Sequence, residues 1–118
     1  MSAGPVSFVV IAQPYAGLVP LVAMLNRHPA ILCHGDRFAP GRIVETDPSG
    51  AQVVRSGRPE IVRRDADPAA FLAAGFEAPG EGLAAVGQGM TVGAASERAL
   101  RVLAERGDLP VIRLRRAN

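Results

Sequence analysis

Apolar and polar residues follow two alternating patterns along this chain, and the alternation predicts strands separated by helices. Val6–Ala12 is an apolar run interrupted only by Ser7, as expected of a strand covered on both faces. Apolar residues then recur at helical spacing from Leu18 to Leu25, and Pro29 ends that helix. Ala30–Cys33 is apolar again and predicts a second, short strand.

The middle of the chain has a weaker pattern. Between Phe38 and Asp65 several Pro and Gly dipeptides mark turns. Gln52–Val54 and Glu60–Val62 either form a small hairpin or lie irregularly.

Helix signals return in the last third. Asp67 followed by Pro68 has the order of an N-cap and a first helical residue. Ser96 is a candidate cap for a later helix that Gly107 ends.

Strands that alternate with helices predict an α/β fold with a three-layer parallel sheet and flanking helices. We expect one domain over residues 1–118. The expected strands are Phe8–Ile11, Ile31–Cys33, Leu83–Val86 (with a possible extension to Met90) and Val111–Leu114, and the expected helices are Leu18–Asn26 and Glu97–Arg106. A parallel strand at Val111–Leu114 normally leads into a covering helix. We therefore expect a truncated domain, completed by a longer chain or by an oligomer.

Composition narrows the class of protein. An apolar fraction of 48% favours a globular fold over a disordered chain. The net charge is only +2, which gives no indication of nucleic-acid binding. The single Cys33 excludes an internal disulfide and fits a reducing compartment. No apolar run approaches the ~20 residues of a membrane span, and the N-terminus lacks signal-peptide features, so we expect a cytoplasmic protein.

The segment Phe8–Pro29 carries the clearest chemical pattern. A buried strand, a turn through Pro14 and Gly17, and a helix form the layout of a P-loop-like phosphate cradle. Such a loop offers free N–H groups and a helix dipole to an anion. No Lys, Arg, Ser or Thr lies between Gln13 and Asn26, so the loop has the layout without the usual side chains.

Four segments match patterns that occur together in one enzyme family. They are Pro14–Val19 followed by His28-Pro29, Cys33–Phe38, Ala85–Met90 and Val111–Asn118. The family's patterns are P-R-S-G-T-T followed by H-P, H-G-E-x-F, V-G-F-K-L and V-I-x-L-x-R-R-N. In this order and spacing, the chain resembles the N-terminal half of a sulfotransferase, with the bacterial carbohydrate sulfotransferases as the most similar subgroup.

The resemblance implies transfer of a sulfuryl group from 3′-phosphoadenosine 5′-phosphosulfate to a hydroxyl of a carbohydrate or glycolipid. By position, the residues of the 5′-phosphosulfate loop are Pro14, Ala16, Gly17, Leu18 and Val19. Asp36 stands at the position of the acid that deprotonates the acceptor, and Arg116 stands where the family holds the 3′-phosphate.

The chain departs from the family where charge is needed. The family's basic residue, Ser, two Thr and Lys are replaced by Tyr15, Ala16, Leu18, Val19 and Gly89. Loss of one transition-state donor typically costs ~10²–10³ in rate. We therefore expect a sulfotransferase-like domain that is inactive as it stands, or a non-catalytic structural or binding subunit of a larger assembly.

The sequence carries weaker signals for two other types of site. His28, Cys33, His34 and Asp36 match no zinc spacing, so no metal site is expected. Gly87–Gly93 is close to a dinucleotide fingerprint, but its last spacing is one residue too long and no acidic residue follows at the required distance. The interpretation as a small nucleotide-binding oxidoreductase depends on those glycines alone.

Overall fold

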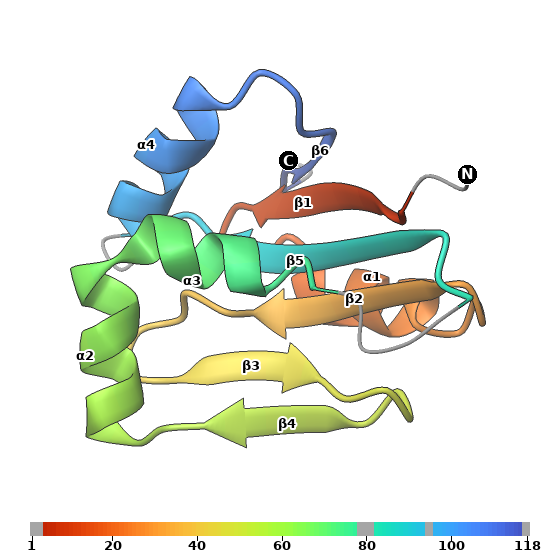
Figure 1. Ribbon diagram of the computed structural model, residues 1–118, viewed down its shortest axis with the longest axis horizontal. Coiled ribbons are helices and arrows are strands. Elements are labelled where there is room, and N and C mark those ends of the chain that lie inside the picture. Colours follow the sequence, from red (N-terminus) through yellow and green to blue (C-terminus); the bar gives the residue numbers. More distant parts are fainter. Residues whose placement is uncertain (1–3, 78–81, 94–95, 117–118) are drawn as a thin grey trace.

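A four-stranded parallel sheet forms the centre of the computed structural model, which describes residues 4–77, 82–93 and 96–116. The strands are β1 (Val6–Ala12), β2 (Ile31–Asp36), β5 (Ala85–Thr91) and β6 (Val111–Leu114), and their order across the sheet is β2-β5-β1-β6 (Figure 1). The predicted α/β fold with a parallel sheet is confirmed. β5 starts two residues later than expected and continues to Thr91.

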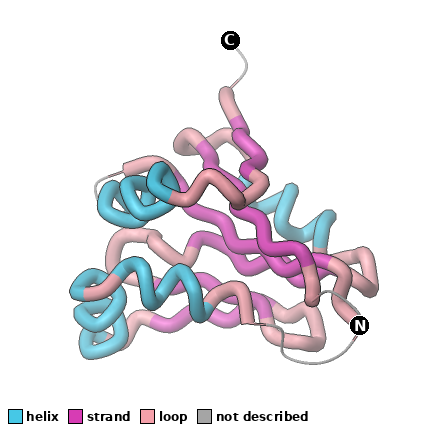
Figure 2. The backbone as a smooth tube through the Cα atoms, turned by 45° about the horizontal axis from the view of Figure 1, so that its top comes forward, coloured by secondary structure: helices cyan, strands magenta, loops and turns pink. Residues whose placement is uncertain are grey.

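Helices cover both faces of this sheet (Figure 2). α1 (Leu18–Leu25) lies on one face, and α3 (Pro68–Ala74) and α4 (Glu97–Glu105) lie on the other. Alternate residues of β1 serve the two faces, which explains its apolar run. On the α1 face the buried cluster is Phe8, Val10, Ala12, Leu18, Val22 and Cys33. On the opposite face it is Val9, Phe38, Leu72, Met90, Ala99 and Leu103.

Asn26 holds the end of α1 against β2. Its side-chain NH₂ donates to the carbonyl of Cys33 at 2.8 Å, and its Oδ1 accepts the N–H of Cys33 at 2.7 Å. Both polar backbone groups of one strand residue are thereby satisfied by a helix cap. This fixes the distance between α1 and the sheet.

The hairpin differs from the one expected. β3 (Ile43–Thr46) pairs antiparallel with β4 (Gln52–Arg55), and the hairpin lies beside β2 (Figure 1). Both alternatives for Glu60–Val62, a hairpin strand or an irregular segment, are wrong, because these residues lie inside α2 (Arg58–Ala66). Proline in the first turn and an acidic residue beside it are helix-start signals, and here they outweigh the short apolar run.

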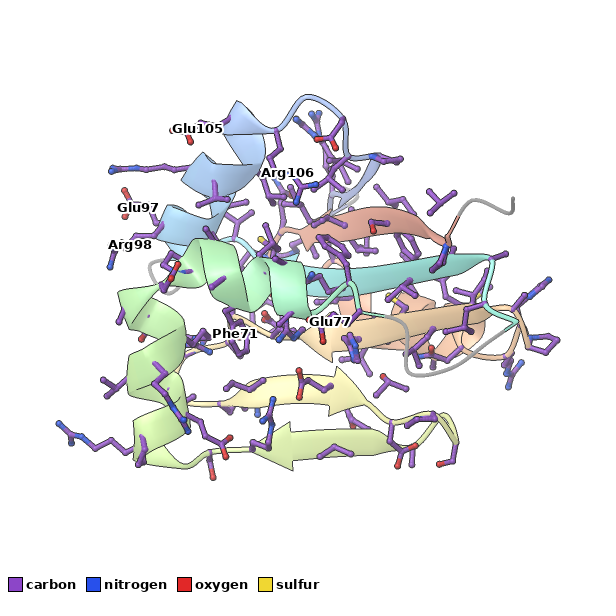
Figure 3. All side chains as sticks on the ribbon, viewed as in Figure 1. Phe71, Glu77, Glu97, Arg98, Glu105 and Arg106 are labelled. Atoms are coloured by element: carbon purple, nitrogen blue, oxygen red, sulfur yellow. The ribbon has the colours of Figure 1, made fainter. Side chains whose placement is uncertain are left out.

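The two predicted caps behave differently. Asp67 accepts the N–H of Ala70 at 3.1 Å, so it caps α3 as expected. Ser96 stands at the N-cap of α4, but its hydroxyl accepts the N–H of Gly93 and donates to the carbonyl of Thr91 at 2.8 Å. It therefore closes the turn before α4. The charged side chains of α4 labelled in Figure 3 project away from the sheet.

Arg37 is almost completely buried and joins four parts of the fold. Its Nε donates to Glu45 of β3 at 2.8 Å. Its Nη1 donates at 2.7 Å to both Gln88 of β5 and the carbonyl of Phe71 in α3. The guanidinium lies 3.8 Å from the centroid of the Phe71 ring. Gln88 in turn donates to the carbonyl of Leu72 at 2.8 Å, so both polar side chains are satisfied.

Gly75, just after α3, leaves the space that this buried group occupies. A Cβ at Gly75 would overlap Arg37 Nη1 and lie 2.6 Å from Gln88 Nε2. Its φ of −67° suits any residue, so only the collision opposes a side chain there. We predict that Gly75→Ala lowers the free energy of unfolding by ~2–4 kcal/mol, because it displaces a buried charge from its partners.

Urea denaturation measures this change. Gly107→Ala is the matched control, because a Cβ there meets nothing within 4 Å. We expect the control to change stability by about 0.5 kcal/mol or less. Equal effects of the two substitutions would contradict the role given to Gly75.

Candidate functional site

The candidate site lies at the carboxyl edge of the parallel sheet. The chain leaves β1 and crosses β5 to reach β2, and it leaves β5 and crosses β1 to reach β6. The two crossovers run in opposite directions, so the edge between β1 and β5 is a topological switch point. Crevices outside the carboxyl ends of strands at such points are the usual ligand sites of open α/β sheets.

A cavity of about 740 Å³ opens at this edge. Six of the residues singled out from the sequence line it: Pro14, Ala16, Gly17, Leu18, Val19 and Asp36. Arg116 does not line it, but its backbone N–H donates to Gln13 Oε1 at 3.1 Å. The first, second and fourth matching segments therefore meet at one edge of the sheet.

The loop between β1 and α1 turns sharply. Ala16 donates its N–H to the carbonyl of Gln13 at 3.1 Å, Tyr15 has a φ of 61°, and Gly17 has a φ of 94°. A positive φ is costly for a residue with a Cβ, and the Tyr15 side chain, 93% exposed, makes few contacts to offset it. Residues 16–19 of this turn line the cavity. The first N–H groups of a helix have no intrahelical partners, and in phosphate-binding loops such groups bind the anion.

Asp36 ends β2 and faces the same cavity. Its Oδ1 accepts the N–H of Phe38 at 3.2 Å. Burial raises the pKa of this carboxyl, while hydrogen bonding from Thr91 and the positive charge of Arg42 oppose the rise. A carboxyl with a raised pKa, beside a cavity, has the properties of a general base.

Sequence reasoning missed Arg42, the only cation among the described residues that line the cavity. Arg64 of α2 positions its segment: Nη1 of Arg64 donates to the carbonyls of Ala39 and Arg42, both at 2.9 Å. The available signal was the Pro40-Gly41 turn in the segment that follows β2, since binding loops in α/β folds follow strands.

The two departures at Leu18 and Gly89 are structurally linked. Gly89 lies in β5, and a Cβ there would stand 2.9 Å from Leu18 Cδ1 and 3.2 Å from the carbonyl oxygen of Gly35. Leu18 is buried in the space that a side chain at Gly89 would need. A side chain at this point of β5 therefore requires Leu18 to move and the Gly35 carbonyl to shift slightly.

The glycines of the dinucleotide interpretation have another role. Gly87 and Gly89 lie inside β5, where a fingerprint would require a turn leading into a helix. A Cβ at Gly87 would overlap the ring of Phe8. These glycines allow close packing within the sheet, and the dinucleotide interpretation is wrong.

The two His side chains accept backbone hydrogen bonds, and Cys33 is buried in the core. His28 Nδ1 accepts the N–H of Ala30, and His34 Nδ1 accepts the N–H of Thr46 at 3.0 Å. Burial raises the pKa of the Cys33 thiol to about 12, which keeps it protonated. In the part of the chain that the structure describes, no three His, Cys, Asp or Glu side chains gather as metal ligands would.

Comparisons with family models, curated proteins and solved structures found no match to this chain. Within the described ranges, no helix has the length and apolar character needed to cross a membrane.

The raised pKa of Asp36 predicts a pH-dependent stability. The folded state binds the Asp36 proton more tightly than the unfolded state, whose carboxyl titrates near 3.8. This contribution is therefore present below pH 3.8 and is lost as pH rises through the folded pKa. Asp36→Asn removes the penalty, so the variant should gain stability relative to wild type between pH 4 and pH 7.

Urea denaturation at several pH values measures the gain. Asp47→Asn is the control of opposite sign, because hydrogen bonds from Ser49 and Ala51 lower the pKa of Asp47. The control should lose stability relative to wild type over the same pH range. A parallel pH profile for wild type and Asp36→Asn would contradict the burial of the Asp36 charge.

Proposed function

We propose that this chain is a sulfotransferase-like domain whose carboxyl-edge cavity corresponds to the donor site of enzymes that use 3′-phosphoadenosine 5′-phosphosulfate. The observation that carries the proposal is the meeting of the loop residues and Asp36 around one cavity at a switch point. Its volume of about 740 Å³ is in the range of small-molecule sites. The acceptor class that accompanies this donor is a carbohydrate or glycolipid.

The cavity has a suitable size for 3′-phosphoadenosine 5′-phosphosulfate, but its lining carries little of the positive charge that this donor requires. The N-terminal N–H groups of α1 suit its 5′ oxyanions. Apart from these groups, the positive charge at the cavity comes from Arg42, and the side-chain hydroxyls come from Tyr15 and Thr91. Sulfuryl transfer develops charge on several oxygens, and positioned cations supply most of its catalysis. We therefore propose that the domain does not catalyse transfer by itself.

Binding and turnover test this proposal separately. We predict that the chain transfers no labelled sulfuryl group to sugar hydroxyls above a heat-killed control. Tyr15→Arg with Ala16→Ser should raise affinity for 3′-phosphoadenosine 5′-phosphate by about tenfold or more in calorimetry, because it restores a charge-assisted hydrogen bond at the loop. Affinity should rise before rate, since binding needs fewer groups than catalysis.

A matched control adds the same charge on α1, away from the loop that precedes it. Met24→Arg with Ala23→Ser alters exposed residues away from the cavity lining. It should change affinity by less than about twofold. Equal gains in both double variants, or no gain in either, would contradict the position of the donor site. Turnover by the unaltered chain would contradict its inactivity.

A second candidate function is a non-catalytic binding subunit of an oligomer. The observation that favours it is the exposed apolar surface at the cavity mouth, where Tyr15, Val19 and Val54 are 93%, 71% and 56% exposed. Apolar side chains grouped on a surface mark association sites. A stable interface would bury roughly 800 Å² per subunit.

Sedimentation at micromolar concentration measures this association. We predict that Val54→Asp weakens it by about tenfold or more, because it places a charge inside the buried contact. Val62→Asp on α2 is the control, since Val62 has the same exposed fraction of 56% and does not line the cavity. A wild-type monomer throughout the concentration range would contradict the oligomer.

A further inference from the structure

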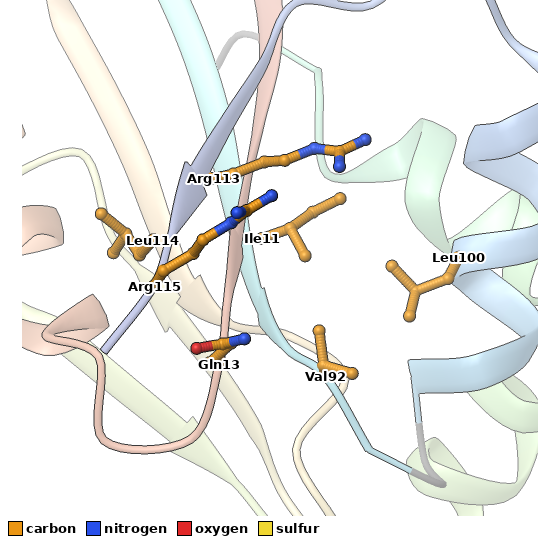
Figure 4. A pocket seen from close by; sticks show the side chains of 7 residues that line it. All are labelled: Ile11, Gln13, Val92, Leu100, Arg113, Leu114 and Arg115. Carbon is orange, nitrogen blue, oxygen red and sulfur yellow. The ribbon is translucent and has the colours of Figure 1, made fainter. Parts of the chain in front are cut away.

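A second cavity lies between β6 and α4, on the side of the sheet away from α1. Its volume is about 370 Å³. The lining residues are Ile11, Gln13, Val92, Leu100, Arg113, Leu114 and Arg115. In Figure 4 the side chains of Arg113 and Arg115 leave β6 in the same direction, toward Ile11 and the side of α4. The cavity therefore combines two cations with an apolar wall.

Strand geometry explains why the two arginines are together. Arg113 lies in β6 and Arg115 directly follows its last residue. Residues two apart in extended backbone point to the same side, and Figure 4 shows both side chains on one side of the chain. Leu114 between them packs with the core cluster of the α1 face. Parallel pairing places Ile11 directly beside Arg113. Leu100 of α4 and Val92 after β5 complete the apolar side.

The charges of this pair are not neutralised within the described residues. Arg101 of α4 and Arg106, directly after α4, form ion pairs with Glu97 and Asp108, respectively. No carboxylate of residues 4–77, 82–93 and 96–116 forms an ion pair with Arg113 or Arg115. Both side chains are exposed, so their guanidinium groups are accessible to an anion from solution.

Gln13 adds a third donor at the inner end. Its Oε1 already accepts the N–H of Arg116 at 3.1 Å, which leaves its NH₂ group for a ligand. Two guanidinium groups and one amide NH₂ suit the several oxygens of a tetrahedral oxyanion. A bare inorganic ion would leave the apolar wall of Ile11, Val92 and Leu100 without a contact. A ligand that also carries an apolar group can cover this wall.

We propose that this cavity is a binding site for a small organic phosphate or sulfate monoester. The oxyanion binds Arg113, Arg115 and the NH₂ of Gln13, and an apolar or aromatic group of the ester packs on Ile11 and Leu100. The site is separate from the carboxyl-edge cavity, which lies on the α1 side, although Gln13 borders both. A volume of about 370 Å³ fits a ligand of this size class.

Titration with 1-naphthyl phosphate and 1-naphthyl sulfate, followed by calorimetry, tests the site. Inorganic phosphate and 1-naphthol represent the two halves of the ligand. Each ester should bind at least about tenfold more tightly than either half, since both parts of the cavity contribute. In NMR spectra of the wild-type chain, the side-chain NH₂ resonances of Gln13 should shift during the titration with either ester. Equal binding of ester and inorganic phosphate, or an unshifted Gln13, would overturn the proposal.

Substitutions locate the bound ester. Arg113→Gln and Arg115→Gln should each weaken binding by about tenfold or more, because each removes a charge-assisted hydrogen bond. Arg101→Gln removes the same charge from α4 outside the cavity, and it should change binding by less than about twofold. Unfolding midpoints in urea establish that each variant is folded.

Arg42→Gln distinguishes this site from the carboxyl-edge cavity. It should leave ester binding unchanged. If Arg42→Gln weakens binding and Arg113→Gln does not, the ester occupies the other cavity and the proposal fails. The same result follows if Arg101→Gln and Arg113→Gln weaken binding equally, because the attraction is then one of general charge.

Discussion

The buried guanidinium of Arg37 is the interaction on which the arrangement of this fold depends. It follows β2 and binds Glu45 of the hairpin, Gln88 of β5 and a carbonyl of α3. Burial lowers the pKa of Arg37, and the hydrogen bond and charge of Glu45 oppose this decrease. The buried guanidinium therefore stays charged only while its partners remain in place. A planar group with five donors can satisfy three elements at once, which an ammonium on a flexible stem would do poorly.

A second buried arginine extends this constraint to the cavity. Arg64 of α2 donates to three carbonyls of the segment after β2, those of Arg37, Ala39 and Arg42. The position of the backbone that bears Arg42 is therefore set by α2. The opposite wall is set by the α1 loop, where Leu18 fills the space beside Gly89. The cavity keeps its shape through packing, although most of the expected cations and hydroxyls are missing.

Local patterns were enough to predict the parallel sheet, α1 and α4. Each depends on periodicity, on proline or on a cap within a few residues, and such signals are read directly from the sequence. The partner of Gln52–Val54 was missed because strand pairing is decided by contacts distant in sequence. The burial of Arg37 and Arg64 was missed for a related reason: an isolated arginine in a polar segment carries no mark that distinguishes a buried side chain from a solvated one.

The site was predictable only in part. Loop residues and Asp36 follow strands, and the ends of parallel strands meet, so their proximity followed from topology. Arg42 comes after a turn whose path depends on Arg64, which lies 22 residues further along the chain. The pairing of Arg113 with Arg115 beside Leu100 depends on where α4 returns to the sheet. No local pattern contains that information.

The position of Cys33 has a practical consequence. It is the only cysteine of the chain, it lies in the middle of β2, and both of its polar backbone groups are held by Asn26. Its thiol is fully buried with a pKa of about 12, so thiol reagents in neutral solution meet neither an accessible sulfur nor a thiolate. Alkylation would therefore proceed only through states in which β2 has separated from α1. The rate at which Cys33 is alkylated therefore reports how often the central sheet opens in the natural chain.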